Sequence, residues 1–144
     1  MQSILALGLA LAAAKAAPTP VGNFRLDTVD GVKVPMVWQD AAMPEGGSVR
    51  FHWIAGRAEF RKDGRFQITL TAMRTGLGLT GTPEPITLAG LWRVVLNFRI
   101  ELRFVDGRKT YWDPVEHFSR LTLKTSYPDL YGQHRAATMV LVRD

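Results

Sequence analysis

The residues best suited to acid–base or metal chemistry are few and scattered along this chain of 144 residues. The three histidines, His52, His117 and His134, lie in three different segments, and no two are spaced to bind one metal ion. His117 ends the segment WDPVEH, in which Asp113 and Glu116 could approach the same ion. Because a dedicated site holds its ion with several convergent ligands, we expect a solvated loop here and no metal site.

No other arrangement of residues indicates catalysis. The chain has no cysteine, which excludes a cysteine nucleophile, disulfides, thiolate zinc sites and lipid attachment through cysteine. It has no nucleophile elbow, no glycine-rich phosphate loop before a helix, and no pair of carboxylates whose spacing fixes their geometry. We therefore predict a protein that is not an enzyme and that has no cofactor.

Basic residues outnumber acidic ones by 18 to 13, and the resulting net charge of +5 attracts anionic surfaces in general. Sheets that bind nucleic acid carry aromatic residues on the same exposed face as their basic residues. Here the aromatic residues mostly alternate to the opposite face, so we expect no nucleic-acid partner. The alternatives are a charged exterior that keeps the protein in solution, or contact with an anionic envelope surface. The arginines concerned are Arg50, Arg57, Arg61, Arg65, Arg74, Arg93, Arg99 and Arg103.

The elements that must position these residues have the pattern of β-strands. After Pro20 no segment shows helical i, i+3, i+4, i+7 periodicity. Turns rich in glycine, proline and aspartate separate short alternating segments, which indicates one all-β domain, an antiparallel meander forming a sandwich or an up-and-down barrel. We expect loops at residues 41–48 and 75–85. The predicted strands cover residues 24–28, 32–38, 49–60, 65–74, 87–105, 109–112, 118–124 and 138–143.

The segment GRAEFRKDGRFQI, residues 56–68, predicts a hairpin whose turn follows from counting. Phe60 and Phe66 share the apolar face only if they lie opposite each other. Arg61 then faces Arg65, and Lys62-Asp63-Gly64 forms a three-residue loop with its glycine in the left-handed region.

Counting also predicts an irregularity upstream, because the apolar face changes from odd-numbered to even-numbered residues. Phe51 and Trp53 are odd-numbered, whereas Ala58 and Phe60 are even-numbered. One extra residue near Ala55-Gly56, a β-bulge, would keep both pairs on the same face. The segment GLWRVVLNFRIELRF, residues 90–104, is either one long bent strand or two strands folded at Asn97 in a turn without glycine.

The inward face of these strands is apolar and aromatic. In a barrel of about eight strands such residues either fill the interior or line a pocket for one small ligand, and both alternatives fit these residue types. We take them as the candidate ligand-binding residues of the barrel interior: Phe51, Trp53, Phe60, Phe66, Ile68, Leu70, Trp92, Val94, Phe98, Ile100, Leu102, Phe104 and Trp112.

The first 16 residues have the features of a signal peptide. Ile4 to Ala14 is an unbroken small and apolar run, and the segment AKA at residues 14–16 offers small residues for cleavage. The run is too short for a membrane span, which needs roughly 20 residues, so the cleaved protein is not expected to be integral to a membrane. The alternatives are a retained anchor, and a misread start or cytoplasmic helix, since the start MQS has no basic side chain.

Several segments together resemble a known family. They are FRLDTVDGVKVP at residues 24–35, VRFHWIAGRAEFRKDGRFQITLTAMR at 49–74, GLWRV at 90–94, IELRFVDG at 100–107, LTLK at 121–124 and VLVRD at 140–144. In this order, from Val21 to Asp144, they resemble bacterial lipocalin-like small exported proteins, a largely uncharacterised family. The resemblance implies an up-and-down barrel of eight strands with an apolar interior, spanning residues 17–144 after the signal helix.

Two functions are compatible with this sequence. The first is binding or sequestration of a small apolar or amphipathic ligand in the interior of an exported barrel, periplasmic or extracellular, with exchange through the end near residues 41–48 and 75–85. The second is a structural or interaction module of the cell envelope whose basic outer face contacts an anionic partner. The state of oligomerisation is left open by the sequence.

Overall fold

The computed structural model describes residues 19–112 and 118–144, which form ten β-strands and one short 3-10 helix, η1 (Leu96–Phe98). The predicted signal segment and the group Asp113, Glu116 and His117 lie outside the described residues. Within them, no helix has the length and apolar character needed to cross a bilayer. The strands are β1 (Gly22–Val29), β2 (Val32–Lys33), β3 (Met36–Ala42), β4 (Ser48–Phe60), β5 (Arg65–Gly76), β6 (Leu79–Val94), β7 (Ile100–Phe104), β8 (Lys109–Trp112), β9 (Arg120–Pro128) and β10 (His134–Arg143).

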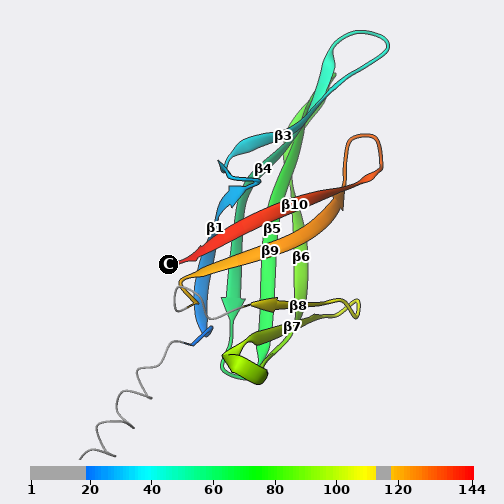
Figure 1. Ribbon diagram of the computed structural model, residues 1–144. Helices are drawn as coiled ribbons and strands as arrows, with labels where there is room; N and C mark the ends of the chain where they lie inside the picture. The colour runs from blue at the N-terminus through cyan, green and yellow to red at the C-terminus, as the bar shows by residue number, and fades with distance from the viewer. Residues whose placement is uncertain (1–18, 113–117) are drawn as a thin grey trace, which may run out of the picture.

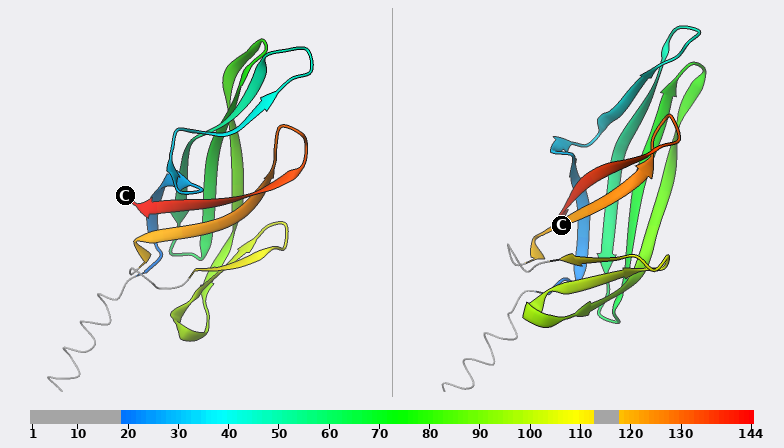
Figure 2. Two further views of the ribbon diagram at one scale, coloured as in Figure 1. Left: turned by 45° about the horizontal axis from the view of Figure 1, so that its top comes forward. Right: turned by 45° about the vertical axis from the view of Figure 1, so that its right-hand side comes forward.

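Eight of the strands follow one antiparallel path in the order β8-β7-β6-β5-β4-β1-β10-β9, with β2 paired to β1 and β3 to β4. The path curls into a nearly closed barrel (Figures 1 and 2). Its two terminal strands, β8 and β9, meet at an opening where the indole Nε1 of Trp112 donates to the carbonyl oxygen of Arg120 at 2.9 Å. The prediction of an all-β antiparallel barrel of about eight strands is therefore confirmed.

The hairpin between β4 and β5 has the predicted register. Phe60 pairs with Phe66, and the amide of Arg61 donates to the carbonyl of Arg65 at 2.9 Å, so the loop contains three residues. Gly64 has a φ of 86°, which a residue with a side chain rarely adopts. The predicted bulge is also present, because the register of β4 shifts between Trp53 and Ala55.

Residues 90–104 form two strands that fold back at Asn97, which is the second of the two alternatives that the sequence allowed. β6 ends at Val94, η1 makes the turn, and β7 begins at Ile100, which pairs with Val94. Asn97 takes a φ of 62° in place of the glycine that such a turn usually needs. The interior positions predicted for Val94 and Phe98 are wrong, because the turn ends the alternation and leaves them 58% and 79% exposed.

The predicted loop at residues 75–85 is wrong as well. β5 and β6 continue to a tight turn at Leu77 and Gly78, and Pro83 and Pro85 lie inside β6. Pairing of β6 with β7 begins at Gly90, so among the described strands the part of β6 that holds the prolines pairs with β5 alone, and the prolines interrupt no second ladder. This hairpin and the hairpin between β3 and β4 project together at what we call the upper end, and η1 lies at the lower end (Figure 1).

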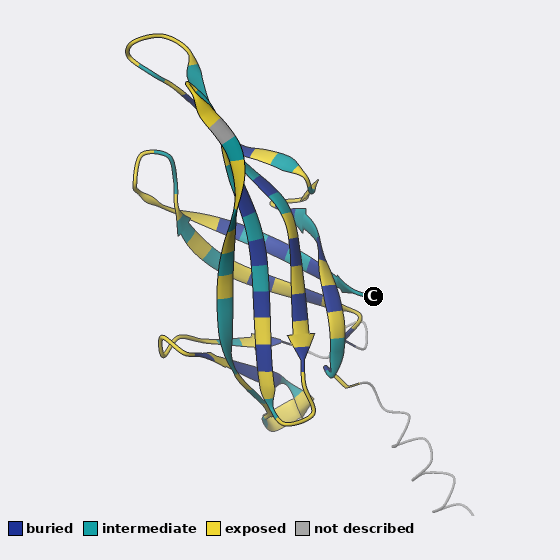
Figure 3. Ribbon diagram, turned by 180° about the vertical axis from the view of Figure 1, so that it is seen from behind, coloured by how far each residue is buried: buried dark blue, intermediate teal, exposed yellow. Residues whose placement is uncertain are grey.

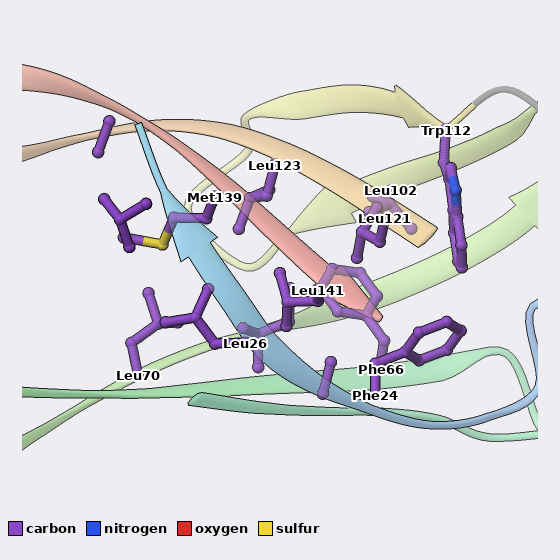
Figure 4. Packing of buried hydrophobic residues seen from close by; sticks show 14 of the residues in the cluster. Phe24, Leu26, Phe66, Leu70, Leu102, Trp112, Leu121, Leu123, Met139 and Leu141 are labelled. Atoms are coloured by element: carbon purple, nitrogen blue, oxygen red, sulfur yellow. The ribbon is translucent and has the colours of Figure 1, made fainter. Parts of the chain in front are cut away.

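One cluster of buried apolar residues forms the core between the strands. Buried and exposed residues alternate along β4 and β5 (Figure 3), which is the pattern of a sheet with one face inward. Side chains from β1, β5, β7, β8, β9 and β10 point toward one another in the centre (Figure 4). Each such side chain stabilises the fold by about 1.5–3 kcal/mol on burial.

Candidate functional site

The residues predicted to line the interior mostly belong to this core. Trp92 is half-buried at the lower end, where its indole Nε1 donates to the carbonyl of Arg61 at 2.8 Å. Val94 and Phe98 are outside, as described above. The other ten predicted residues are buried: Phe51, Trp53, Phe60, Phe66, Ile68, Leu70, Ile100, Leu102, Phe104 and Trp112.

Aromatic rings from separate strands meet across the lower half of the barrel. The ring of Trp112, on β8, lies with its centroid 5.3 Å from both Phe24 on β1 and Phe60 on β4. Phe60 stacks on Phe66 at 5.5 Å, and Phe66 meets the edge of Phe104 at 5.3 Å. Such contacts stabilise the fold beyond their buried area. The strand alternation could have indicated Phe24, which was not among the predicted interior residues.

A second aromatic cluster occupies the upper half. Phe51 and Trp53 of β4 contact Trp38 of β3, and both lie within 5.7 Å of the ring of Tyr127 on β9. Trp38 donates its indole N–H to Asp30 at 3.1 Å, whereas the indole N–H of Trp53 is buried without a partner among the described residues. Tyr127 was missed because the sequence placed it in a loop rather than at the end of a strand.

These two clusters lie inside the barrel. One row of paired residues crosses four neighbouring strands on the outside of the lower half. Arg65 pairs with Leu91, Leu91 with Arg103, and Arg103 with Lys109. All four side chains are exposed, since their neighbours Phe66 and Phe104 point inward. We call these four residues the cationic row.

Glu101 lies beside the cationic row and is the one charged residue that is buried among the described residues. Its carboxylate accepts from Nε and Nη2 of Arg93 at 3.1 and 3.4 Å, and Nη2 of Arg103 lies 3.8 Å away. The hydrogen bond from Arg93 lowers the pKa of Glu101 below the ordinary range, against the opposing effect of burial. Arginine side chains rather than the core cover this carboxylate, so it remains charged and holds two arginines in place.

The turn between β6 and β7 adds apolar residues to the same end. Leu96 is 87% exposed, Phe98 79% and Val94 58%, and Figure 3 shows η1 in the exposed colour. We call Val94, Leu96 and Phe98 the apolar tip. Large apolar side chains grouped at the surface mark an interaction site more often than scattered ones do. The sequence alternation had hidden this group by assigning two of its members to the interior.

Two hollows lie on the outer face beside the cationic row and share Leu91. One has a volume of about 370 Å³ and is lined by Arg61, Arg65 and Val105 among others. The other, of about 270 Å³, lies between Arg93, Glu101 and Arg103. Both combine guanidinium groups with apolar side chains, which suits a partner that carries anionic groups next to hydrocarbon.

A third hollow, of about 110 Å³, lies at the opening between β8 and β9. Leu88, Phe104 and Leu123 form its apolar floor, and basic residues stand at its rim. The rim residues are Arg108, Lys109 and Lys124.

The remaining chemistry-bearing residues do not come together. Nε2 of His52 lies 2.8 Å from the hydroxyl of Thr75, and His134 is exposed at the start of β10. Within residues 19–112 and 118–144, no three His, Asp or Glu side chains are grouped as metal ligands. The arrangement therefore offers cationic and apolar surfaces for binding, and no grouped acid–base residues in the described part of the chain.

Comparison of the chain with protein-family models, with curated proteins and with solved structures found no match.

Proposed function

We propose that the protein is an exported, lipocalin-like barrel without catalytic activity, and that its cationic outer face holds it against an anionic surface of the cell envelope. The observation that carries this proposal is the cationic row, in which Arg103 and Lys109 are paired and exposed, and Arg65 lies exposed two strands away beyond Leu91. Export is supported by the signal-like segment of residues 1–16.

Within the described part of the chain, the basic residues of this face outnumber its carboxylates. Asp63 lies within 4.0 Å of Arg61 and Arg65, and Glu101 serves Arg93 and Arg103. Among the described residues, three carboxylates, those of Glu59, Asp63 and Glu101, thus accompany five basic residues of this face: Arg61, Arg65, Arg93, Arg103 and Lys109. The excess positive charge favours association with anionic groups, and salt weakens that association.

Replacing two cations of the face tests this proposal. Each basic residue near an anionic membrane surface contributes about 1 kcal/mol, so Arg65→Gln with Arg103→Gln weakens binding about 30-fold. Arg50→Gln with Arg135→Gln is the matched control, because it removes the same charge from exposed residues elsewhere on the barrel. Binding to polyphosphate and to anionic vesicles is measured by sedimentation at about 50 and 300 mM salt.

We expect the first variant to bind weakly, the control to bind nearly as the parent does, and all binding to fall with salt. Equal losses in the two variants would show that net charge, and not this face, is responsible. Binding that is absent at low salt, or insensitive to salt, would rule out the proposal.

A second function, binding of a small amphipathic acid, is favoured by the hollow between β8 and β9. Its floor of Leu88, Phe104 and Leu123 fits a short hydrocarbon chain, and Lys109 and Lys124 could meet the carboxylate at its rim. This location differs from the barrel interior, which is the binding place expected from the sequence.

Calorimetric titration with a medium-chain carboxylic acid and with the matching alcohol tests this second function. We expect the acid to bind more tightly than the alcohol, and Lys109→Gln with Lys124→Gln to remove the difference, because the rim charges select the carboxylate. Equal binding of acid and alcohol to the parent, or no binding of either, would end this interpretation.

A further inference from the structure

The apolar tip is held away from the core by its own backbone. The amide of Val95 donates to the carbonyl of Arg99 at 2.8 Å, and the amide of Arg99 donates back to Leu96 at 3.4 Å. These bonds close the turn, so that Leu96 and Phe98 project from a defined loop. The exposure of the two side chains follows from this geometry.

The backbone of the tip is also unfavourable for the residues that it carries. Asn97 and Phe98 have φ values of 62° and 59°. Asparagine tolerates this left-handed region, but a bulky residue there is an outlier that glycine would avoid. Strain of this kind is found where function requires a particular side chain. The side chain in question is the exposed ring of Phe98.

We propose that the anionic partner of the protein is a lipid bilayer, and that the apolar tip inserts among its acyl chains while the neighbouring arginines contact the lipid phosphates. This inference rests on the proposed function, because it assigns the partner of the same cationic face. Insertion of the tip would add an apolar contribution to the free energy of binding, which attraction between charges does not supply.

The order of side chains behind the tip matches the layers of a bilayer surface. Arg93 directly precedes Val94, and Arg99 directly follows Phe98, where its guanidinium lies 4.8 Å from the ring centroid of Tyr111. Tyr111 is itself 46% exposed. Apolar residues at the end, with an aromatic residue and cations behind them, are typical of peripheral proteins whose apolar side enters the headgroup boundary.

The charges beside the tip argue against the other occupants. In a symmetric contact between two copies of this chain, each patch would meet itself. Arg93, Arg99 and Arg103 would then lie against the same arginines of the second copy, and like charges placed together are unfavourable. An anionic polymer would neutralise the arginines but would leave Leu96 and Phe98 in water, whereas a bilayer covers both kinds of group.

The test compares two double variants in sedimentation with vesicles. Leu96→Ser with Phe98→Ser removes the apolar tip. Leu77→Ser with Leu79→Ser is the matched control at the upper hairpin, where these leucines are 54% and 47% exposed. Vesicles of phosphatidylcholine with phosphatidylglycerol provide the anionic bilayer, and polyphosphate provides an anionic partner without hydrocarbon. Thermal unfolding verifies that each variant is folded.

We expect the tip variant to bind the anionic vesicles at least about tenfold more weakly than the parent and to bind polyphosphate equally well. The control variant should bind both as the parent does. If the tip variant keeps full affinity for vesicles, the tip does not insert into the bilayer. The same conclusion follows if its affinity for polyphosphate falls as much as its affinity for vesicles. Either result would leave the salt-sensitive binding of the parent protein unchanged, so the proposed function would still stand.

A fluorescence measurement gives a second readout, and it uses a substitution that keeps the tip apolar. Phe98→Trp places a reporter in the tip, and Leu77→Trp places one in the upper hairpin. With anionic vesicles, we expect acyl chains carrying bromine to quench the additional emission of the first variant and to leave that of the second unchanged. Equal quenching of both, or of neither, would overturn the inference, as would a change of oligomeric state on removal of the tip.

Discussion

The indole N–H of Trp112 donates to the carbonyl oxygen of Arg120 at 2.9 Å and joins β8 to the start of β9. These two strands end the path of eight, and the described residues show no backbone ladder between them. This side-chain hydrogen bond bridges the opening of the barrel at its lower end. Trp53 provides the contrast, because its ring is completely buried while its N–H has no partner among the described residues.

Replacing each of these two tryptophans by phenylalanine separates the effect of the hydrogen bond from that of ring size. Trp112→Phe loses a ring and a hydrogen bond, whereas Trp53→Phe loses a ring and an unpaired donor whose burial is unfavourable. We expect Trp112→Phe to lower the free energy of unfolding by about 1–3 kcal/mol more than Trp53→Phe does. Denaturant unfolding measures both. Equal losses would indicate that Trp53 finds a partner in solution.

Glu101→Gln should make the protein less stable and its outer face more cationic. The pKa of Glu101 is lowered in the folded state, chiefly by the hydrogen bond from Arg93. Its contribution to stability is therefore complete above the pKa that it has in the unfolded chain, and is lost as the pH falls through the lowered folded value. The difference in unfolding free energy between parent and variant should be largest near neutral pH and should shrink in acid.

Glu59→Gln is the control for this substitution, because Glu59 is an exposed glutamate on β4 of the same sheet and its replacement changes the net charge equally. We expect it to affect unfolding little. Both variants lose one negative charge and should bind anionic vesicles somewhat more tightly. A pH-independent difference between parent and Glu101→Gln would contradict the role assigned to this carboxylate.

Alternation of side chains predicted the parts of the fold in which one face is buried. Phe60 and Phe66 fixed the register of the β4–β5 hairpin, since a shift of one residue would have exposed one of them. The change from odd to even apolar positions after Trp53 likewise located the bulge. In both places the local pattern and the tertiary packing require the same arrangement.

The upper hairpin could not be predicted in this way. Glycine and proline between residues 76 and 85 indicate a loop by their local preferences, but β5 supplies a continuous partner for this part of β6. The prolines are compatible with a strand that is paired mainly on one side. Local propensity is overridden here by pairing that the sequence does not display.

The candidate site was hidden for a related reason. The alternation from Trp92 to Phe104 continues unbroken through Phe98, so nothing local distinguishes an exposed ring from a buried one. The turn at Asn97 changes this, and it places apolar residues beside Arg93 and Arg99. The sequence indicated a basic exterior correctly, but its combination with an apolar tip depends on where the strand folds back.

Gly90→Ala should disturb the cationic row through the backbone. A Cβ at Gly90 would overlap the carbonyl oxygen of Arg103 on the neighbouring strand. β7 would have to move away from β6, at a cost of about 3 kcal/mol, at the upper end of the usual range for overpacking. Thermal unfolding measures this loss, and weaker binding to polyphosphate should accompany it because Arg103 is displaced.

Gly31→Ala is the comparison for that experiment, because a Cβ at Gly31 meets nothing within 4 Å. Its φ of 82° still makes alanine unfavourable, by about 1–2 kcal/mol, but polyphosphate binding should be unchanged. If Gly90→Ala is as stable as the parent, the close approach of β6 and β7 at this residue is incorrect.

Phe98→Gly should separate stability from binding. Glycine relieves the left-handed strain at this residue, and the exposed ring contributes little burial, so the free energy of unfolding should stay the same or rise by up to about 1 kcal/mol. Affinity for anionic vesicles should nevertheless fall about tenfold, because an apolar side chain no longer enters the bilayer. Denaturant unfolding and vesicle sedimentation give the two values. A loss of about 3–5 kcal/mol, as expected for truncating the buried Phe60, would show that Phe98 is packed in solution and would contradict an exposed tip.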